Sequence, residues 1–107
     1  MLPPYTDDAP ERAALDATVG SMVVEFGSNG CSICQATQPL ISEAMRSKPL
    51  PHLRIQDGRG RRLGRSYGIT LWPTLVLLRD GREVGRLVRP GSATDITAAL
   101  GQLGPAA

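Results

Sequence analysis

The chain has 107 residues, enough for one domain around a single hydrophobic core, so we expect residues 1–107 to fold together. Its net charge of +2 is too small to indicate a nucleic acid partner, and an apolar fraction of 41% is ordinary for a globular protein. Residues 1–8 have neither a basic start nor an apolar run, and the longest apolar stretch, at 71–78, is too short for a bilayer. We therefore expect no signal peptide, no membrane contact and a cytoplasmic location.

The N-terminal part of the chain predicts a helix and then a strand. Residues 8–18 have apolar side chains near helical spacing, with Asp7 or Asp8 as the N-cap and Gly20 after the last turn. Residues 22–26 are apolar and partly β-branched, which is typical of a strand that is covered on both faces.

The middle of the chain predicts a long helix, a short strand and a short helix. The apolar residues of 31–47 recur at helical spacing, and Pro39 should kink this helix rather than end it, because the pattern continues past it. Residues 52–55 alternate in character as a strand does, and residues 61–67 predict a short helix that Gly68 closes.

The C-terminal part predicts a β-hairpin and a helix. Residues 74–78 and 83–88 flank an Asp-Gly dipeptide at 80–81, which is typical of a tight hairpin turn, and Ser92 or Thr94 caps the last helix. An early strand–helix–strand unit needs parallel strands, whereas the hairpin needs antiparallel ones. The sequence therefore predicts an α/β fold with a mixed central sheet and helices on both of its faces.

Cys31 and Cys34 are the only cysteines, and they stand three apart where the long helix is predicted to begin. Random placement of two cysteines would give that spacing about 2% of the time. A buried strand, a short loop and Cys-x-x-Cys opening a helix is typical of a redox dithiol, although two small apolar residues that never react are an alternative. The free N–H groups and the dipole of a helix start stabilise a thiolate, so we predict a lowered pKa for Cys31 and not for Cys34.

Glu25 is a carboxylate in an otherwise apolar central strand. An anion is costly to bury, so we expect the pKa of this group to be raised, and such a carboxyl group can exchange protons. The alternative is a glutamate that faces solvent at an edge of the sheet.

The sequence has too few ligands for a metal site and lacks the motif for haem attachment. A zinc site needs about four ligands, and beyond the two cysteines only His52, otherwise an ordinary strand residue, is at hand. Haem attachment needs a histidine directly after the second cysteine, where Gln35 stands. We therefore expect no metal and no cofactor apart from the redox-active disulfide itself.

Arginine supplies almost all of the basic charge, and five arginines fall in one short region. This region either docks an acidic partner or, more ordinarily, is a solvated loop. Its members are Arg54, Arg59, Arg61, Arg62 and Arg65.

The order of these features resembles the thioredoxin family. The resemblance rests on the strand at 23–26 followed by Cys-x-x-Cys, on Pro39, on the segment 67–74 and on the Asp-Gly turn, and it extends from about residue 15 to residue 103. It implies a thioredoxin fold. It also implies a thiol–disulfide oxidoreductase, a thioredoxin-like protein-disulfide reductase that forms a mixed disulfide with its substrate.

The resemblance assigns roles to three residues of the dithiol region. Cys31 would attack the substrate disulfide, and Cys34 would resolve the mixed disulfide. Glu25 matches the position of a buried aspartate that serves the resolving cysteine, so it would accept the proton of Cys34. The partners of the whole chain would be protein disulfides and a reductase that donates electrons, and we expect a monomer.

The resemblance also implies a substrate-binding rim. Pro73 matches a cis-proline that faces the dithiol, and Trp72 before it would pair its backbone with an extended substrate segment. Gly91 matches a glycine near the substrate groove, and Gly30 stands where the family usually has tryptophan. Trp72 replaces the usual isoleucine and is either a flat apolar wall over the disulfide or a filler of a surface gap.

A function of another class is the alternative. The same fold would serve a binding, chaperone-like or redox-sensing module with little turnover. The missing tryptophan before Cys31 and the bulky Trp72 are the departures that favour it. The family usually has Gly-Pro between the cysteines, where this chain has Ser32-Ile33, and this pair changes the geometry of the helix start and so the reduction potential.

Overall fold

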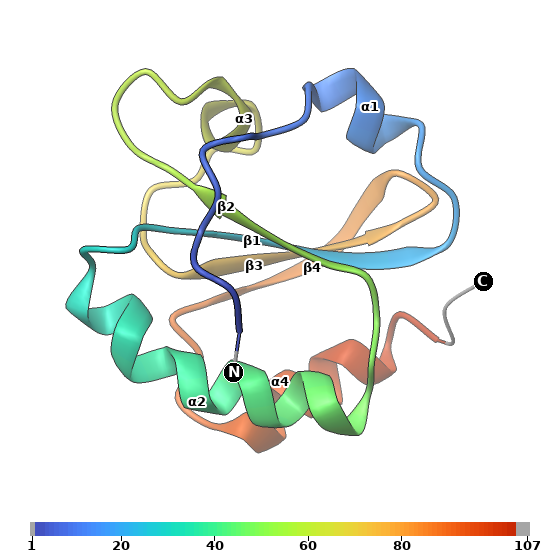
Figure 1. Cartoon of the computed structure of the whole chain (residues 1–107). Coiled ribbons are helices and arrows are strands. Elements are labelled where there is room, and N and C mark those ends of the chain that lie inside the picture. Colours follow the sequence, from blue (N-terminus) through green and yellow to red (C-terminus); the bar gives the residue numbers. More distant parts are fainter. Residues whose placement is uncertain (1, 105–107) are drawn as a thin grey trace.

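A four-stranded mixed sheet runs through the middle of the molecule (Figure 1). The computed structural model describes residues 2–104, so residues 1 and 105–107 of the expected domain lie outside it. The strand order is β2-β1-β3-β4, with β1 parallel to β2 and antiparallel to β3, and β3 antiparallel to β4. The strands are β1 Ser21–Gly27, β2 His52–Gln56, β3 Thr74–Arg79 and β4 Arg82–Val88. The predicted mixed sheet is confirmed.

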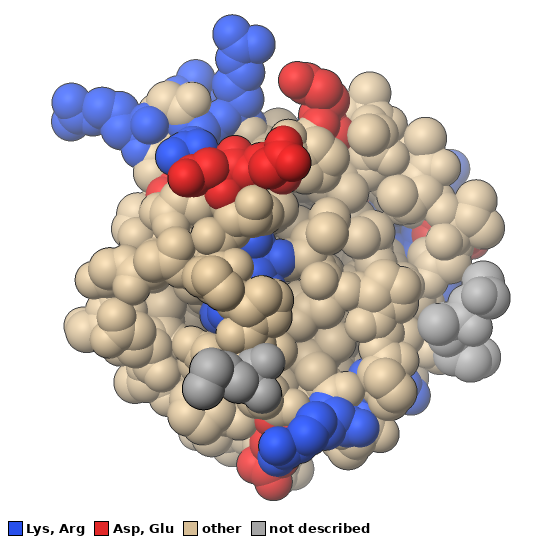
Figure 2. All heavy atoms as spheres, in the orientation of Figure 1, with Lys and Arg blue, Asp and Glu red and all other residues tan. Residues whose placement is uncertain are grey.

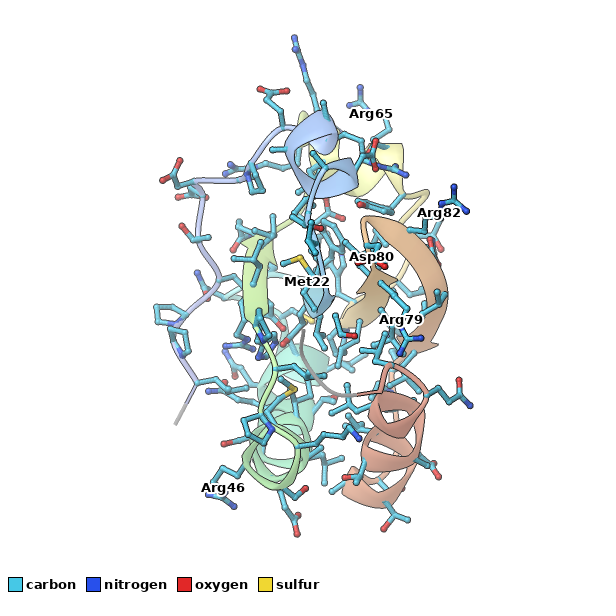
Figure 3. The ribbon with its side chains drawn as sticks, turned by 90° about the vertical axis from the view of Figure 1, so that its right-hand side faces the viewer. Met22, Arg46, Arg65, Arg79, Asp80 and Arg82 are labelled. Carbon is cyan, nitrogen blue, oxygen red and sulfur yellow. The ribbon has the colours of Figure 1, made fainter. Side chains whose placement is uncertain are left out.

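Helices cover both faces of this sheet (Figure 1). α2 (Ser32–Ser47) and α4 (Ala93–Gly101) pack against each other on one face, and the short helices α1 (Arg12–Asp16) and α3 (Arg62–Ser66) lie on the other. Figure 3 shows the layers from the side, with Met22 near the centre and Arg46 and Arg65 at opposite ends of the molecule. No helix within residues 2–104 is long and apolar enough to cross a membrane.

Alternation along β1 sends its side chains into two separate cores. Even-numbered positions pack with α1 and α3, and odd-numbered positions face α2 and α4. The first core contains Leu15, Met22, Val24, Phe26, Ile55, Leu63, Tyr67, Val76 and Leu78. The second contains Val23, Ile41, Ala44, Met45, Leu75, Leu77, Ile96, Leu100 and Leu103. Glu25, at an odd position, therefore lies on the same side of the sheet as α2.

The prediction for the first helix is wrong at its start and at its cap. Residue Glu11 is the N-cap and makes no side-chain cap bond, and the helix has five residues. The chain before it is extended, because Thr6 pairs with the edge strand β2: its N–H donates to the Arg54 carbonyl, and its carbonyl accepts from the Gln56 N–H, both at 2.9 Å. This pairing takes Thr6 to the edge of the sheet, and the chain then bends at Asp7 before the helix begins at Arg12.

The β3–β4 hairpin turns as its Asp-Gly dipeptide predicts. Asp80 and Gly81 both have positive φ, 50° and 79°, as a type I′ turn requires. The Asp80 carboxylate accepts a hydrogen bond from the Gly20 N–H at 2.8 Å, which ties the turn to the start of β1. A Cβ atom on Gly81 would collide with the carbonyl group of Asp16 at the end of α1. Gly81 is therefore required both by the backbone conformation of the turn and by the close contact with the end of α1.

We predict that Gly81→Ala lowers the free energy of unfolding by roughly 3 kcal/mol, from the left-handed backbone and from the forced displacement of α1. Equilibrium unfolding in urea measures this loss. Gly101→Ala is the matched control, because a Cβ at Gly101 meets nothing within 4 Å and alanine favours the helix. Equal stability of the two variants would contradict the close approach described above.

Candidate active site

The two thiols sit at the start of α2 in different surroundings. Cys31 is the N-cap, is partly exposed, and its sulfur accepts a hydrogen bond from the Cys34 N–H at 3.2 Å. Cys34 lies one turn further along and is 1% exposed. Both cysteines are free thiols in this structure. One sulfur is thus accessible to a reaction partner while the other is covered.

These surroundings shift the two pKa values in opposite directions. For Cys31, burial alone would raise the pKa, but hydrogen bonds from the Cys34 side chain and from the N–H groups of Cys34 and Ile33, together with the charge of Arg89, lower it. For Cys34, burial and the hydrogen bond to Cys31 raise the pKa to about 11. The prediction of a lowered pKa for Cys31 but not for Cys34 is confirmed. Cys31 is the thiol that ionises first.

The loop before β3 contains the expected cis-proline. The Trp72–Pro73 peptide bond is cis, and Pro73 is buried directly before β3. The Trp72 carbonyl accepts a hydrogen bond from Arg89 Nε at 2.8 Å, and the Arg89 N–H donates to the Pro73 carbonyl at 2.9 Å. Because Arg89 also lowers the pKa of Cys31, its guanidinium connects this loop with the dithiol electrostatically.

Trp72 is half-buried and fixed in place by a hydrogen bond. Its indole N–H donates to the Asp57 carboxylate at 2.9 Å, and the Asp57 side chain is itself buried. The ring borders a surface cavity of about 300 Å³, which Arg59, Arg61 and Arg65 also line. Trp72 is therefore anchored to Asp57.

Two glycines of the expected substrate-binding rim have open space where a side chain would begin. Gly30 and Gly91 are both exposed, and a Cβ atom at either position would meet nothing within 4 Å. Gly30 directly precedes Cys31, and Gly91 follows the end of β4, two residues after Arg89. A small side chain would therefore fit at either position without a clash.

Glu25 is fully buried, which excludes the solvent-exposed alternative. Arg54 donates to both carboxylate oxygens at 3.0 Å, His52 Nε2 lies 2.8 Å from Oε1, and the Tyr5 hydroxyl donates to Oε2. Burial alone would raise the pKa of Glu25, but the hydrogen bonds from His52, Arg54 and Tyr5 and the charge of Arg54 lower it. The expected raised pKa is therefore wrong, because burial was considered without the partners that come with it.

The lowered pKa also makes this cluster a source of stability. A carboxyl group whose pKa is depressed by folding contributes stability that is fully present above its unfolded pKa. That contribution is lost as the pH falls through the folded value.

Sequence reasoning missed the three partners of Glu25. Arg54 is not part of a surface cluster but is 4% exposed, and His52 is not an ordinary strand residue. A signal for both exists, because they are two apart on β2 and so share a face of the sheet next to β1. Tyr5 carries no such signal. Its ring occupies the space where Gly27 would have a Cβ, and Arg54 stacks on it at 4.1 Å.

The remaining arginines of the predicted cluster are at the surface. Figure 2 shows basic side chains that project beside acidic ones at the end of the molecule that contains α3. Arg59, Arg62 and Arg65 are exposed, and Arg61 pairs with Asp7 at 2.7 Å. An exposed ion pair contributes little to stability, so this surface is mainly solvated charge.

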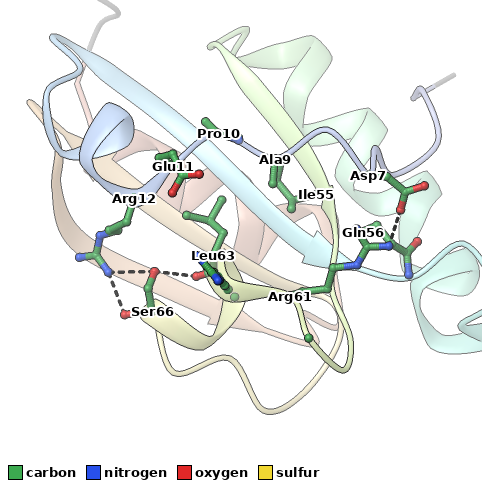
Figure 4. A pocket seen from close by; sticks show the side chains of 13 residues that line it. Asp7, Ala9, Pro10, Glu11, Arg12, Ile55, Gln56, Arg61, Leu63 and Ser66 are labelled. Atoms are coloured by element: carbon green, nitrogen blue, oxygen red, sulfur yellow. Dashed lines mark hydrogen bonds and ion pairs between the residues drawn. The ribbon is translucent and has the colours of Figure 1, made fainter.

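A separate cavity of about 270 Å³ lies between α1, α3 and the end of β2 (Figure 4). Arg12 donates to the Ser66 carbonyl on one side of it, and the Arg61–Asp7 pair closes the other. No cysteine lines it, so it lies apart from the dithiol. Within the described residues, no group of three or more His, Cys, Asp or Glu side chains is placed to hold a metal ion.

A family model described as Thioredoxin matches residues 6–102, which is most of the chain. The chain belongs to the thioredoxin family. Thioredoxin from Chlamydia trachomatis is 32% identical over 81 residues, which cover 73% of this chain and 78% of that protein. Thioredoxin H2-1 from rice is 31% identical over 72 residues, 66% of this chain, and the match spans only about half (52%) of the rice protein.

Among solved structures, thioredoxin 2 from Pseudomonas aeruginosa PAO1 in its reduced form is 51% identical. It superimposes with a TM-score of 0.87, and the match covers 96% of each chain. The predicted thioredoxin fold is thereby confirmed. Thioredoxins are thiol–disulfide oxidoreductases that act on protein disulfides with a reductase as electron donor, so the predicted class of protein is confirmed as well.

We predict that iodoacetamide at pH 7 modifies Cys31 at least about 100-fold faster than Cys34, because thiolate is the reactive form and burial keeps Cys34 protonated. Mass spectrometry of the labelled peptides over a pH series measures both rates. Cys34 should gain reactivity only as the pH approaches its raised pKa of about 11. Equal rates at the two thiols would contradict the described asymmetry.

We predict that Arg54→Met lowers the free energy of unfolding by about 3 to 5 kcal/mol, because it leaves the Glu25 carboxylate buried without its charge partner. Arg46→Met is the matched control, since Arg46 is exposed at the end of α2 (Figure 3). The control should change stability by no more than about 0.5 kcal/mol. Chemical denaturation at pH 7 compares the two, and an equally small effect of both would show that the buried pair is not needed.

Proposed function

We propose that this chain reduces protein disulfides with Cys31 as the nucleophile and Cys34 as the resolving thiol. The Cys31 thiolate attacks one sulfur of the substrate disulfide, forms a mixed disulfide and expels the other substrate sulfur as a thiolate. Cys34 then loses its proton and attacks the Cys31 sulfur. The Cys31–substrate bond breaks, the second substrate thiolate leaves, and a Cys31–Cys34 disulfide remains for a reductase to reduce.

The opposite pKa shifts of the two thiols carry this proposal. A nucleophile needs a low pKa and access to its target, and Cys31 has both. A resolving thiol must not compete for substrate, and the burial and raised pKa of Cys34 keep it unreactive until the mixed disulfide has formed. Two chemically equivalent thiols would not support this division of work.

The proposed substrate groove lies between the cis-proline loop and the start of α2. Trp72 would present its main chain to an extended substrate segment, with Pro73 fixing the loop. Gly30 and Gly91 would let that segment approach, because neither has a side chain to obstruct it. The indole bond to Asp57 supports a rigid apolar wall at Trp72.

Glu25 is proposed to serve Cys34 when that thiol loses its proton. Its burial and its position on the α2 side of the sheet support this role. A monomer in the cytoplasm that draws electrons from a reductase completes the proposal. There, cellular reductants keep thiols reduced, and a dithiol without other cysteines is expected to cycle.

We predict that the wild-type chain reduces insulin disulfides with dithiothreitol as the electron source, and that Cys31→Ser abolishes this activity. The precipitation of insulin chains measures turnover. Cys34→Ser should instead accumulate a mixed disulfide with the substrate, because the attacking thiol is intact and the resolving one is missing. An inactive wild type would support the binding or redox-sensing alternative.

A further inference from the structure

The cavity beside Trp72 has a basic lining that the proposed reaction of the two thiols does not use. We propose that this cavity is a substrate subsite for the carboxylate of an aspartate or glutamate that lies close to the target disulfide. The chain would then prefer protein disulfides with acidic neighbours. This inference rests on the proposed function and deepens it, because it names the class of protein substrate.

Positive charge predominates in the lining of this cavity. Arg59, Arg61 and Arg65 contribute guanidinium groups, and Asp57 is the one carboxylate among the described residues that line it. The Asp57 carboxylate is buried and accepts the indole N–H of Trp72 at 2.9 Å. It makes no ion pair with any of the three arginines in the described part of the chain. The cavity therefore attracts a further negative charge.

Two of the three guanidinium groups are available to a ligand. Arg61 pairs with Asp7 at 2.7 Å, whereas Arg59 and Arg65 are exposed and have no ion pair with any residue of 2–104. Their charge is solvated in the free chain, so a carboxylate that binds there displaces water and not another side chain. The planar guanidinium group also matches the geometry of a carboxylate.

The cavity adjoins the proposed substrate groove through Trp72. The ring of Trp72 borders the cavity, while its main chain is the part proposed to pair with an extended substrate segment. Thr70, from the same loop, lines the cavity as well and adds an exposed hydroxyl that can donate a hydrogen bond. Side chains close to the substrate disulfide would therefore lie beside the arginines.

Exposed charges of this kind select among substrates without deciding whether the reaction occurs. Each exposed ion pair is weak, so two or three of them together change the apparent affinity for a substrate by about 10-fold. These contacts are the same in the bound substrate and in the transition state. The preference is therefore expected in KM, with kcat little changed.

The test uses three synthetic peptides that each contain one disulfide and no tryptophan. They differ only in the residues next to the cysteines, which are glutamate, glutamine or lysine. Reduction with dithiothreitol as the electron source gives kcat and KM, and the reaction without the protein gives the intrinsic reactivity of each peptide. We expect kcat/KM, corrected for that reactivity, to be about 10-fold higher for the glutamate peptide than for the lysine peptide at low ionic strength. In 0.5 M NaCl the difference should fall below about 2-fold, because salt screens exposed charges.

Charge reversal locates the preference. Arg65→Glu should abolish it, and the double variant Arg59→Glu, Arg65→Glu should make the lysine peptide the better substrate. Both variants should reduce the glutamine peptide within about 2-fold of the wild-type rate. Arg46→Glu is the matched control for Arg65→Glu, because Arg46 is exposed at the opposite end of the molecule (Figure 3), and it should keep the wild-type preference.

A binding measurement gives a readout that does not need turnover. The glutamate peptide with both cysteines replaced by serine should change the emission of Trp72, which is the single tryptophan of the chain. The lysine peptide with the same replacement should leave the emission unchanged at the same concentration. Arg65→Glu should remove the response to the glutamate peptide, and Arg46→Glu should retain it.

The outcomes are distinguishable. A wild type that reduces none of the peptides overturns the proposed function, whereas a response of Trp72 to the serine form of the glutamate peptide would still support the carboxylate subsite. Equal corrected kcat/KM values for all three peptides overturn only the subsite. A preference that persists in the double variant, or that Arg46→Glu removes as well, also overturns it, since the preference then comes from charge elsewhere on the chain.

Discussion

The rest of the structure depends on one buried ion pair between neighbouring parallel strands. Glu25 on β1 is in register with Arg54 on β2, and both side chains are almost free of solvent. A slip of one residue between these strands would turn the arginine to the other face of the sheet and leave the carboxylate unpaired among apolar side chains. The register of β1 and β2 therefore also determines the electrostatics of the site.

This constraint also organises the segment before the first helix. The Arg54 guanidinium stacks on Tyr5 and donates a hydrogen bond to the Pro3 carbonyl, while its backbone carbonyl accepts from Thr6. One arginine side chain and its peptide group therefore hold an extended segment across the edge of the sheet. The N-terminal residues belong to the site for this reason, and not through any regular element of their own.

Local patterns explain what the sequence could predict. Cys31 and Cys34 could be assigned different chemistry because helix starts stabilise thiolates wherever they occur, and the Asp-Gly turn needs only its own two backbone conformations. Glu25 could be placed in a buried strand from its neighbours alone. Each of these features is decided by residues within about one turn or one strand of the chain.

The errors concern contacts between distant residues. Burial raises the pKa of an isolated carboxyl group, and the opposite shift at Glu25 comes from Arg54, which is 29 positions away in the chain. The first helix begins later than predicted for the same kind of reason, because Thr6 pairs with β2. Neither outcome can be derived without the strand register, which a single sequence does not supply.

Trp72 has a practical consequence as the chain's single tryptophan. Its carbonyl binds the same Arg89 guanidinium whose charge acts on Cys31, and its indole is anchored to Asp57, so the fluorophore is both close to the redox chemistry and restrained. The ultraviolet emission of the whole molecule therefore comes chiefly from this one ring. Under the proposed function, the emission of this ring should respond to the oxidation state of the dithiol and to a bound substrate in the unlabelled protein.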